Sequence, residues 1–487
     1  AVQAGLENVS LTSTGNAANV LDLQAGAGLE TLNIEGDQDL TLRDSDNDFD
    51  SVSTIDASGT DTSDELTGNL DLDLSTNTAD ITVNGGSGDD TVTFQDTKLD
   101  TNDSVDLGGG TNTIGLEATD GSPANFTTDV SGSVSNVQQI ELSAVDITPS
   151  DTDDSHTVDV NGAFGGDIDT VIVNLSDNAS DDDDVTFNNL NNNSTVEVGT
   201  DNKGVTFSAA SDTNDDEVTL DLQGVTQDGD IDDNSNEFET VNIQSSSGEN
   251  DLDGNNVSIT GADQVNISGG NNLINGTITP AGSDAVIDAQ SMTGQLGTDG
   301  NTVTLAGNLT NAEILLGTGD DHVDIGANDA LSSLSKIDGG DGVDVITATE
   351  GSLTANDTPT VENVSVLEID DNGANTIDAS NFTNVGELRF TDSSNNTNTQ
   401  TVTNLAAGTV IGLGSANAAL GGTTSIIDVG LATDSSDDSL TFDVNTSTAA
   451  AVADVATSTT VETVDLQVDD SNDATLDLAD VDATTVN

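Results

Sequence analysis

Residues 81–94 read ITVNGGSGDDTVTF and join two alternating segments through a glycine-rich turn with two consecutive aspartates. In both segments Val, Ile or Phe alternates with Thr or Asn, which is typical of a strand buried on one face. Related turns begin at Gly86 and Gly108, 22 residues apart (108 − 86), and at Gly317 and Gly340, 23 apart (340 − 317). A unit that returns at this spacing predicts one coil of chain per repeat.

A second phrase, acidic–x–apolar–x–apolar, follows the same spacing. Its copies are ENVSL from Glu7, ETLNI from Glu30, ETVNI from Glu239, DQVNI from Asp263 and ETVDL from Glu462. We therefore predict an all-β fold, an elongated β-solenoid or β-roll-like stack with coils of about 22–24 residues. Chance periodicity in a low-complexity chain is one alternative. The spacing lapses in residues 120–236, where β-sandwich-like segments could interrupt the stack.

The charge of the chain is extreme. Among 487 residues, 5 Lys and Arg face 90 Asp and Glu, a formal net charge of −85. This excludes nucleic acid as a partner, because phosphate would be repelled at every approach, and it argues against an anionic membrane surface. Repulsion on this scale destabilises a compact chain unless cations screen or ligate the carboxylates. A disordered chain is the alternative. Because 33% of the residues are apolar and alternate along the chain, we expect an ordered β protein whose partner is a small cation.

Several chemistries are missing from the sequence. Cysteine is absent, which removes disulfides, thiolate zinc sites and cysteine nucleophiles. No apolar run approaches the roughly 20 residues that span a membrane. The two histidines, His156 and His322, lie 166 positions apart (322 − 156), and no nucleophile elbow, zinc-protease motif or P-loop occurs. We expect no enzymatic activity. Because neither an initiator Met nor a signal peptide is found at Ala1, we expect a processed chain or a fragment.

The glycine turns follow a nine-residue pattern, GGxGxDxUx, in which U is apolar. Residues 85–93 and 339–347 fill every position, and residues 316–324 lack only the first glycine. Glycine permits a positive φ and leaves its carbonyl oxygen accessible. Ca²⁺ takes about 6–8 oxygen ligands, so one turn supplies part of the shell and a neighbouring coil completes it. The alternative is an acidic loop without an ion. The predicted ligands are Gly86, Gly88, Asp89, Asp90, Gly108, Gly110, Asn112, Gly317, Gly319, Asp320, Asp321, Gly340, Asp341, Gly342 and Asp344.

A different acidic stretch, DSDNDFD in residues 44–50, has the alternating carboxylates of an EF-hand loop at Asp44, Asp46 and Asp48. It lacks the glycine expected at the sixth position, where Phe49 stands, and the glutamate expected at the twelfth. We predict an irregular calcium loop here, with a solvated turn as the alternative.

The nonapeptide resembles that of RTX proteins, which wind parallel β-rolls around Ca²⁺. Within residues 278–350, the succession VIDAQSMTGQL, TVTLAGNL, ILLGTGDDHVDI and KIDGGDGVDVITATE is similar to the C-terminal lattice-forming regions of bacterial RTX-type S-layer proteins. The resemblance implies an extracellular, calcium-dependent β-solenoid that assembles into sheets and is exported by a type I secretion apparatus. We divide the chain into a repeat region with the first calcium-type turns (1–120), an acidic β-rich region (121–277), an RTX-like calcium-binding region (278–358) and a C-terminal β-repeat region (359–487).

The leading hypothesis is an extracellular structural protein, a calcium-dependent and self-assembling S-layer or filament subunit at the cell surface. Its partners would be multiple Ca²⁺ ions and copies of itself, with no nucleic acid and no membrane insertion. One alternative is a stalk or binding segment of a large RTX adhesin. Another is a halophilic surface protein that is not specific for calcium. An RTX-type enzyme is the remaining alternative, disfavoured by the missing catalytic constellation.

Overall fold

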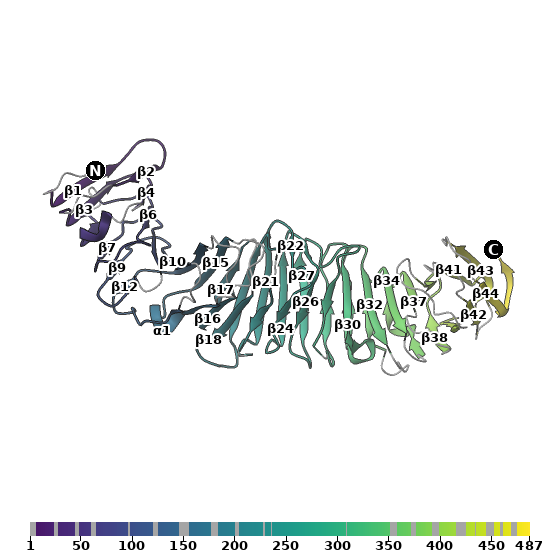
Figure 1. The fold of residues 1–487 in the computed structure, drawn as a ribbon. Coiled ribbons are helices and arrows are strands. Elements are labelled where there is room, and N and C mark those ends of the chain that lie inside the picture. Colours follow the sequence, from purple (N-terminus) through teal and green to yellow (C-terminus); the bar gives the residue numbers. More distant parts are fainter. Residues whose placement is uncertain are drawn as a thin grey trace. The chain divides into compact units, whose positions relative to one another are not determined.

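The computed structural model is nearly all-β and forms a β-solenoid of parallel strands, which confirms the predicted fold class. Within it, compact contacts define two units, Ala1–Glu239 (unit 1) and Thr240–Asn487 (unit 2). In each unit, strands from successive coils lie side by side, as the labelled arrows of Figure 1 show. The four regions named from the motifs stay a prediction. The structure describes residues 6–23, 28–43, 48–59, 65–95, 98–119, 125–145, 155–176, 184–199, 204–226, 229–234, 236–307, 309–350, 358–371, 376–391, 399–414, 425–433, 435–444, 452–457, 461–468 and 475–487.

Unit 1 holds three series of hydrogen-bonded parallel strands. Series A is β1 (Asn8–Ser13), β3 (Thr31–Gly36), β5 (Thr54–Asp56), β7 (Thr82–Asn84), β9 (Ser104–Asp106) and β12 (Val134–Ser135). Series B is β2 (Asn19–Asp22), β4 (Leu40–Arg43), β6 (Leu70–Asp73), β8 (Thr91–Gln95), β10 (Thr113–Thr119), β13 (Gln139–Val145), β15 (Thr170–Ser176), β17 (Ser194–Val198) and β19 (Glu217–Gln223). Series C is β11 (Asn125–Phe126), β14 (Ser155–Asp159), β16 (Asp184–Leu190), β18 (Val205–Ala209) and β20 (Ile231–Asp233). A short helix, α1 (Val160–Phe164), and a 3₁₀ turn, η1 (Asp48–Ser51), lie between strands.

In the described part of unit 2, the strands likewise form three parallel series, together with one short pair. Series D is β21 (Thr240–Ser247), β24 (Gln264–Gly269), β27 (Val286–Met292), β29 (Glu313–Leu315), β31 (Lys336–Asp338), β33 (Thr360–Glu362) and β36 (Phe382–Thr383). Series E is β23 (Asn256–Ser258), β26 (Gly276–Thr279), β28 (Val303–Leu305), β30 (His322–Ala330), β32 (Val345–Glu350), β34 (Val366–Asp371), β37 (Glu387–Thr391), β39 (Val410–Leu413), β41 (Ser439–Val444), β43 (Val461–Val468) and β45 (Ala483–Val486). Series F is β35 (Thr376–Asp378), β38 (Thr399–Leu405), β40 (Ser425–Leu431), β42 (Val452–Thr457) and β44 (Thr475–Asp480). The pair is β22 (Asn250–Asp251) with β25 (Leu273–Ile274), and the 3₁₀ turns are η2 (Leu331–Ser333) and η3 (Ala379–Asn381).

The core is built from columns of identical positions in successive coils. Because the strands are parallel and in register, an apolar residue on one coil lies against its counterpart on the next. One fully buried column in unit 1 is Val92, Ile114, Ile140, Val171, Val196 and Leu220. The intervening side chains, such as Thr and Gln in β8 and Glu, Thr and Asp in β19, point away from the core, which explains the period-two pattern in the sequence.

The predicted interruption in residues 120–236 is not found in the described part of that segment, where the named strands pair in parallel as elsewhere. The coil from Thr113 to its partner Gln139 has 26 residues (139 − 113), and the coil from Gln139 to Thr170 has 31 (170 − 139). The extra residues lie between strands, and α1 is one such insertion. The longer loops therefore change the spacing of the repeats in the sequence, while the register of the paired strands is kept.

Among the described residues, no helix has the length and apolar character needed to cross a membrane.

Candidate functional site: the stacked glycine corners

The predicted calcium turns form corners where the chain passes from one strand series to the next. In unit 1, residues 106–112 link β9 to β10 and are called here the Asn112 corner. In unit 2, residues 338–344 link β31 to β32 and are called the Asp344 corner. Each follows an earlier corner of the same kind, residues 84–90 in unit 1 and 315–321 in unit 2.

Paired turns stack directly through backbone hydrogen bonds. Gly109 N donates to Gly86 O at 2.9 Å, and Asp341 N donates to Gly317 O at 3.0 Å. The glycines are required by this close approach, because a methyl group on the second turn would overlap a carbonyl oxygen of the first. The overlapping pairs are Gly108 with Gly86 O, Gly110 with Gly88 O, Gly340 with Gly317 O and Gly342 with Gly319 O. The structure thus brings together the predicted turns that the 22- and 23-residue spacings had paired.

The outer aspartates of the corners accept hydrogen bonds from the next coil. Asp89 Oδ1 accepts from Thr111 N at 2.7 Å, and Asp320 Oδ1 accepts from Val343 N at 2.8 Å. Both carboxylates therefore tie one coil to the next through a side-chain bond.

The inner aspartate of the first corner, Asp90, is fully buried. Both of its oxygens are satisfied: Oδ1 accepts from Leu70 N and Oδ2 from Gly86 N, each at 2.8 Å. Burial raises the pKa of Asp90 to about 6, against the lowering effect of the two N–H groups.

The inner aspartate of the Asp344 corner has only one satisfied oxygen. Asp344 is fully buried, and its Oδ1 accepts from Asp321 N at 3.1 Å. Its Oδ2 is buried without a hydrogen-bond partner. The carboxylate of Asp321, one coil earlier, faces the N–H groups of Leu296 and Gly317, which oppose the rise of its pKa on burial. Burial raises the pKa of Asp344 to about 7, and the negative charges of Asp321, Asp320 and Asp341 raise it further. A buried carboxylate oxygen without a donor is costly unless a proton or a cation reaches it.

Asn112 occupies the same place in the other corner and is fully satisfied. Its Oδ1 accepts from Asp90 N at 2.8 Å. Its Nδ2 lies within hydrogen-bond distance of three carbonyl oxygens: Leu107 O at 3.3 Å, Gly109 O at 3.0 Å and Asn136 O at 2.8 Å. This network fixes the orientation of the amide, because only the nitrogen can donate to carbonyl groups.

The Asp344 corner offers ligands that suit calcium. A methyl group on Gly339 would overlap Asn363 O and lie 2.9 Å from Asp344 Oδ2, so a carbonyl and a carboxylate oxygen both face this glycine. Hard oxygen ligands of this kind are what Ca²⁺ prefers. In the described part of the chain, no group of three or more His, Cys, Asp or Glu side chains could hold a metal ion. A calcium site would therefore need backbone carbonyl oxygens as well as the carboxylate of Asp344.

The predicted EF-hand-like loop falls largely outside the described residues, which include neither Asp44 nor Asp46. Asp48 begins η1, and the next residue, Phe49, is fully buried. The side chain at the position of the expected glycine is therefore a core anchor. The calcium loop predicted here stays a prediction.

Sequence reasoning missed a second set of corner residues, asparagines in the left-handed conformation. Asn136 and Asn363 have φ of 57° and 54°, and Asn is one of the few residues that tolerate this region. Asn136 Nδ2 donates to Asp106 Oδ1 at 2.6 Å, and Asn363 Nδ2 donates to Asp338 Oδ1 at 2.9 Å. The signal available in the sequence is an Asn–Val step two to three residues before the next strand, which recurs at Asn136, Asn363 and Asn384.

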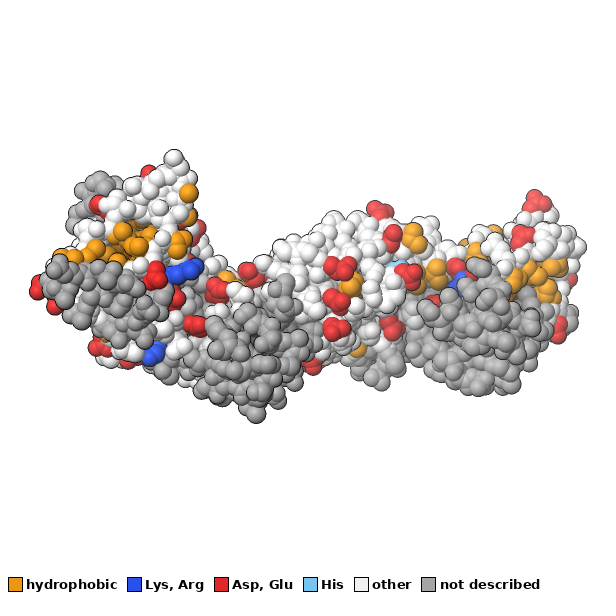
Figure 2. Space-filling model, turned by 45° about the horizontal axis from the view of Figure 1, so that its top comes forward, with side chains coloured by type: hydrophobic (Ala, Val, Ile, Leu, Met, Phe, Trp, Pro, Cys, Tyr) orange, Lys and Arg blue, Asp and Glu red, His pale blue; other side chains and the backbone are white. Residues whose placement is uncertain are grey.

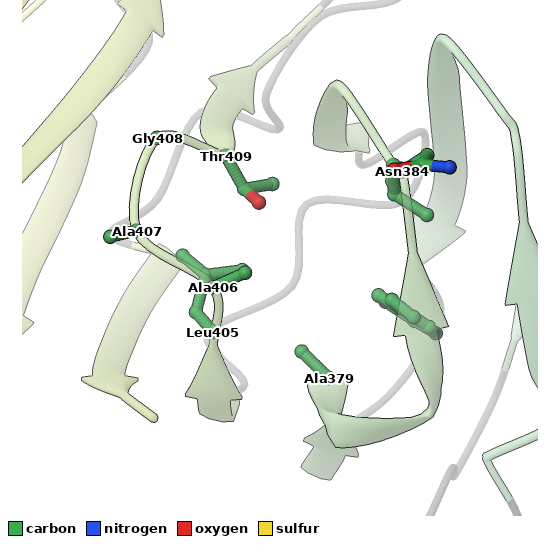
Figure 3. Close-up of a pocket in the computed structure, with 9 residues that line it drawn as sticks. Ala379, Asn384, Leu405, Ala406, Ala407, Gly408 and Thr409 are labelled. Atoms are coloured by element: carbon green, nitrogen blue, oxygen red, sulfur yellow. The ribbon is translucent and has the colours of Figure 1, made fainter. Parts of the chain in front are cut away.

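A cavity of about 310 Å³ lies in unit 2 between η3 and the turn that follows β38 (Figure 3). It is lined by Ala379, Phe382, Asn384, Val385, Leu405, Ala406, Ala407, Gly408 and Thr409. None of these side chains is ionisable, so the cavity offers no acid, base or metal-binding carboxylate.

On the face drawn in Figure 2, red Asp and Glu side chains are spread over the described surface and outnumber the blue Lys and Arg.

Comparisons with known proteins do not identify a relative: no protein-family model, curated protein or solved structure matches this chain.

Proposed function

We propose that this chain is a calcium-dependent structural protein of the cell exterior, a self-assembling S-layer or filament subunit. The observation that carries the proposal is the buried Oδ2 of Asp344, which has no hydrogen-bond donor and faces Gly339, as the carbonyl oxygen of Asn363 does. A divalent cation at this place would neutralise the carboxylate of Asp344 and, through the carbonyl oxygen of Asn363, join two successive coils. Calcium fits because the available ligands are all oxygen atoms.

The overall charge supports the same proposal. Neutralising half of the 85 excess negative charges would take roughly 20 divalent ions, since 42/2 is 21. External calcium near millimolar concentration fills even weak sites of the kind found in extracellular modules, at about 10⁻⁴–10⁻³ M. Cytosolic calcium would leave such sites empty. The chain would therefore fold and assemble after export.

The structural role and the assembly rest on the resemblance to RTX-type S-layer regions together with the fold. A parallel solenoid presents the same polar outward positions on successive coils, which gives a repeating surface for contacts between copies. Five large apolar side chains stand exposed among the described residues: Leu6, Val20, Val343, Val468 and Val486. Contacts through uncharged groups suit copies that otherwise repel one another.

The test is one sample followed by circular dichroism and electron microscopy, first in CaCl₂ and then after addition of EGTA, in moderate NaCl. The proposal expects a β spectrum and ordered arrays or fibres with calcium, and loss of both on chelation. Stiff monomers with calcium would favour an adhesin stalk. Folding in NaCl alone, with no effect of EGTA, would favour a halophilic surface protein and overturn the calcium proposal.

A further inference from the structure

The Asn112 and Asp344 corners have the same backbone arrangement. The two sequences, DLGGGTNTI from Asp106 and DGGDGVDVI from Asp338, align without a gap. In both, the first aspartate accepts a hydrogen bond from a left-handed asparagine of the next coil, Asn136 or Asn363. The glycine two residues after this aspartate has φ of 73° in one corner and 80° in the other.

The contacts to the preceding coil repeat as well. The last residue of each corner accepts, through Oδ1, the N–H of the preceding inner aspartate: Asp90 N to Asn112 and Asp321 N to Asp344. The stacking bonds from Gly109 N and Asp341 N and the outer bonds to Asp89 and Asp320 are also equivalent. The register of β12 on β9 and of β33 on β31 places Asn136 and Asn363 at matching positions.

The corners differ at a single atom of this inner position. In the Asn112 corner it is Nδ2, whose two hydrogens serve the carbonyl oxygens of Leu107, Gly109 and Asn136, all within hydrogen-bond distance. In the Asp344 corner it is Oδ2, which has no donor. The carbonyl groups that correspond by alignment are those of Gly339, Asp341 and Asn363, and Asn363 O crowds the same glycine as Asp344 Oδ2. One corner thus presents a neutral N–H donor to these carbonyl groups where the other presents a further oxygen.

We propose that the Asn112 amide nitrogen takes the place of a bound cation, so that the Asn112 corner is closed without metal while the Asp344 corner requires one. The part concerning Asp344 rests on the proposed function; the part concerning Asn112 stands on its own hydrogen bonds. An NH₂ group that satisfies carbonyl oxygens from two coils joins those coils as an ion would. Between these two corners, the metal requirement is therefore a local property, set by Asn or Asp at a position where the second polar atom of an Asp finds no donor.

The consequence is that unit 1 and unit 2 respond differently to calcium removal at these corners. Asp90, the inner residue of the earlier corner in unit 1, needs no cation, because Leu70 N and Gly86 N donate to its two carboxylate oxygens. In unit 2, Asp344 carries an oxygen without a donor. Chelation should loosen the start of β32 and leave the start of β10 closed.

Hydrogen exchange measured by mass spectrometry on the full chain tests the proposal, with CaCl₂ or EGTA at pH 7.5. Peptides covering β10 report on the Asn112 corner and peptides covering β32 report on the Asp344 corner. In the unmodified chain, EGTA should accelerate exchange about tenfold or more in β32, a factor that corresponds to roughly one buried hydrogen bond, and leave β10 unchanged. The variants exchange the two residues: Asn112→Asp should make β10 sensitive to calcium, and Asp344→Asn should abolish the sensitivity of β32.

Asp344→Asn is the more demanding variant, because β32 must keep its protection in EGTA as well as in CaCl₂, and damage to the fold would remove protection under both conditions. A control, Asn112→Ala, removes the donor without adding charge, so β10 should lose protection equally with and without calcium. If β32 responds to calcium in the unmodified chain but Asn112→Asp leaves β10 indifferent to it, the inference is overturned while the proposed function stands. If no peptide of the unmodified chain responds, the proposed function fails. A calcium-reversible loss of protection in Asn112→Asp would then still support the role of Asn112.

Discussion

Direct stacking of the corners predicts that a single methyl group at Gly340 separates two coils. Gly340 has φ of 80°, and a Cβ atom there would overlap Gly317 O. Gly254, also in unit 2, supplies a matched control, because its φ is 86° but a Cβ atom would meet nothing within 4 Å. Substituting each with Ala separates the cost of the left-handed backbone from the cost of the close approach.

The expected magnitudes follow from these contacts. Both variants pay for an alanine in the left-handed region, about 1–2 kcal/mol. At Gly340 the coils must also move apart by about 1 Å, which stretches the 3.0 Å bond from Asp341 N to Gly317 O beyond the usual limit. Losing that bond and its neighbour adds about 1–2 kcal/mol. We expect a local loss of about 2–4 kcal/mol for Gly340→Ala and about 1–2 kcal/mol for Gly254→Ala.

Because a solenoid unfolds locally, hydrogen exchange measures these losses better than one global unfolding curve. Calcium should be held saturating, and exchange read in peptides covering β31 to β32 for Gly340→Ala and β22 to β23 for Gly254→Ala. The reasoning is refuted if the two substitutions cost the same, since the structure gives Gly340 a backbone neighbour that Gly254 lacks.

Three further predictions concern charge and corner geometry. The pKa of Asp344 is about 7 in the folded protein, against an ordinary 3.8, so the folded protein holds this proton more tightly than the unfolded chain does. Without metal, the stability of the protein is therefore greatest below pH 4 and falls towards pH 7, by up to about 4 kcal/mol. Metal-free unfolding at pH 5 and pH 8 should show a smaller fall for Asp344→Asn, and an equal fall would contradict the assignment. Arg389 is buried between Glu387 and Asp443, and Arg389→Gln should lower the free energy of unfolding by about 3–5 kcal/mol. Lys336 is partly exposed, and Lys336→Gln should lower it by under about 1 kcal/mol, both measured by urea unfolding. Asn363→Ala should destabilise the Asp344 corner by about 1 kcal/mol more than Asn363→Gly, because glycine tolerates the φ of 54°; equal losses in hydrogen exchange would argue against a left-handed corner.

The solenoid could be predicted because its core columns impose a pattern that survives in one sequence. Val92 and Ile114 lie opposite each other on adjacent strands, and the turns before them keep the spacing of one coil. The lapse of the repeat spacing in residues 120–236 misled the prediction. The spacing between repeats includes the loop residues and changes with loop length, whereas the register of the paired strands does not. The 31-residue coil from Gln139 to Thr170 keeps every strand pair while adding α1 between them.

The corners were located by sequence, but the role of each carboxylate was not. Asp89 and Asp90 are adjacent in the chain, yet Asp90 shares the inward parity of Val92 and is buried, while Asp89 points outward and accepts a bond from the next coil. The alternation of apolar and polar residues in the sequence was enough to predict that Asp90 points inward. The hydrogen bonds of the Asn112 amide could not be predicted, because they depend on the carbonyl groups of Leu107 and of a coil 24 residues later (136 − 112).

Calcium binding itself gives the most direct test of the account. Equilibrium dialysis of the full chain against CaCl₂ in moderate NaCl would measure bound calcium per chain for the unmodified protein and for Asp344→Asn. We expect the unmodified chain to bind several ions and the variant to bind fewer, because an amide nitrogen then occupies the place of the unpartnered oxygen. No calcium bound to the unmodified chain, or the same amount bound to both, would contradict the claim that a cation closes the Asp344 corner.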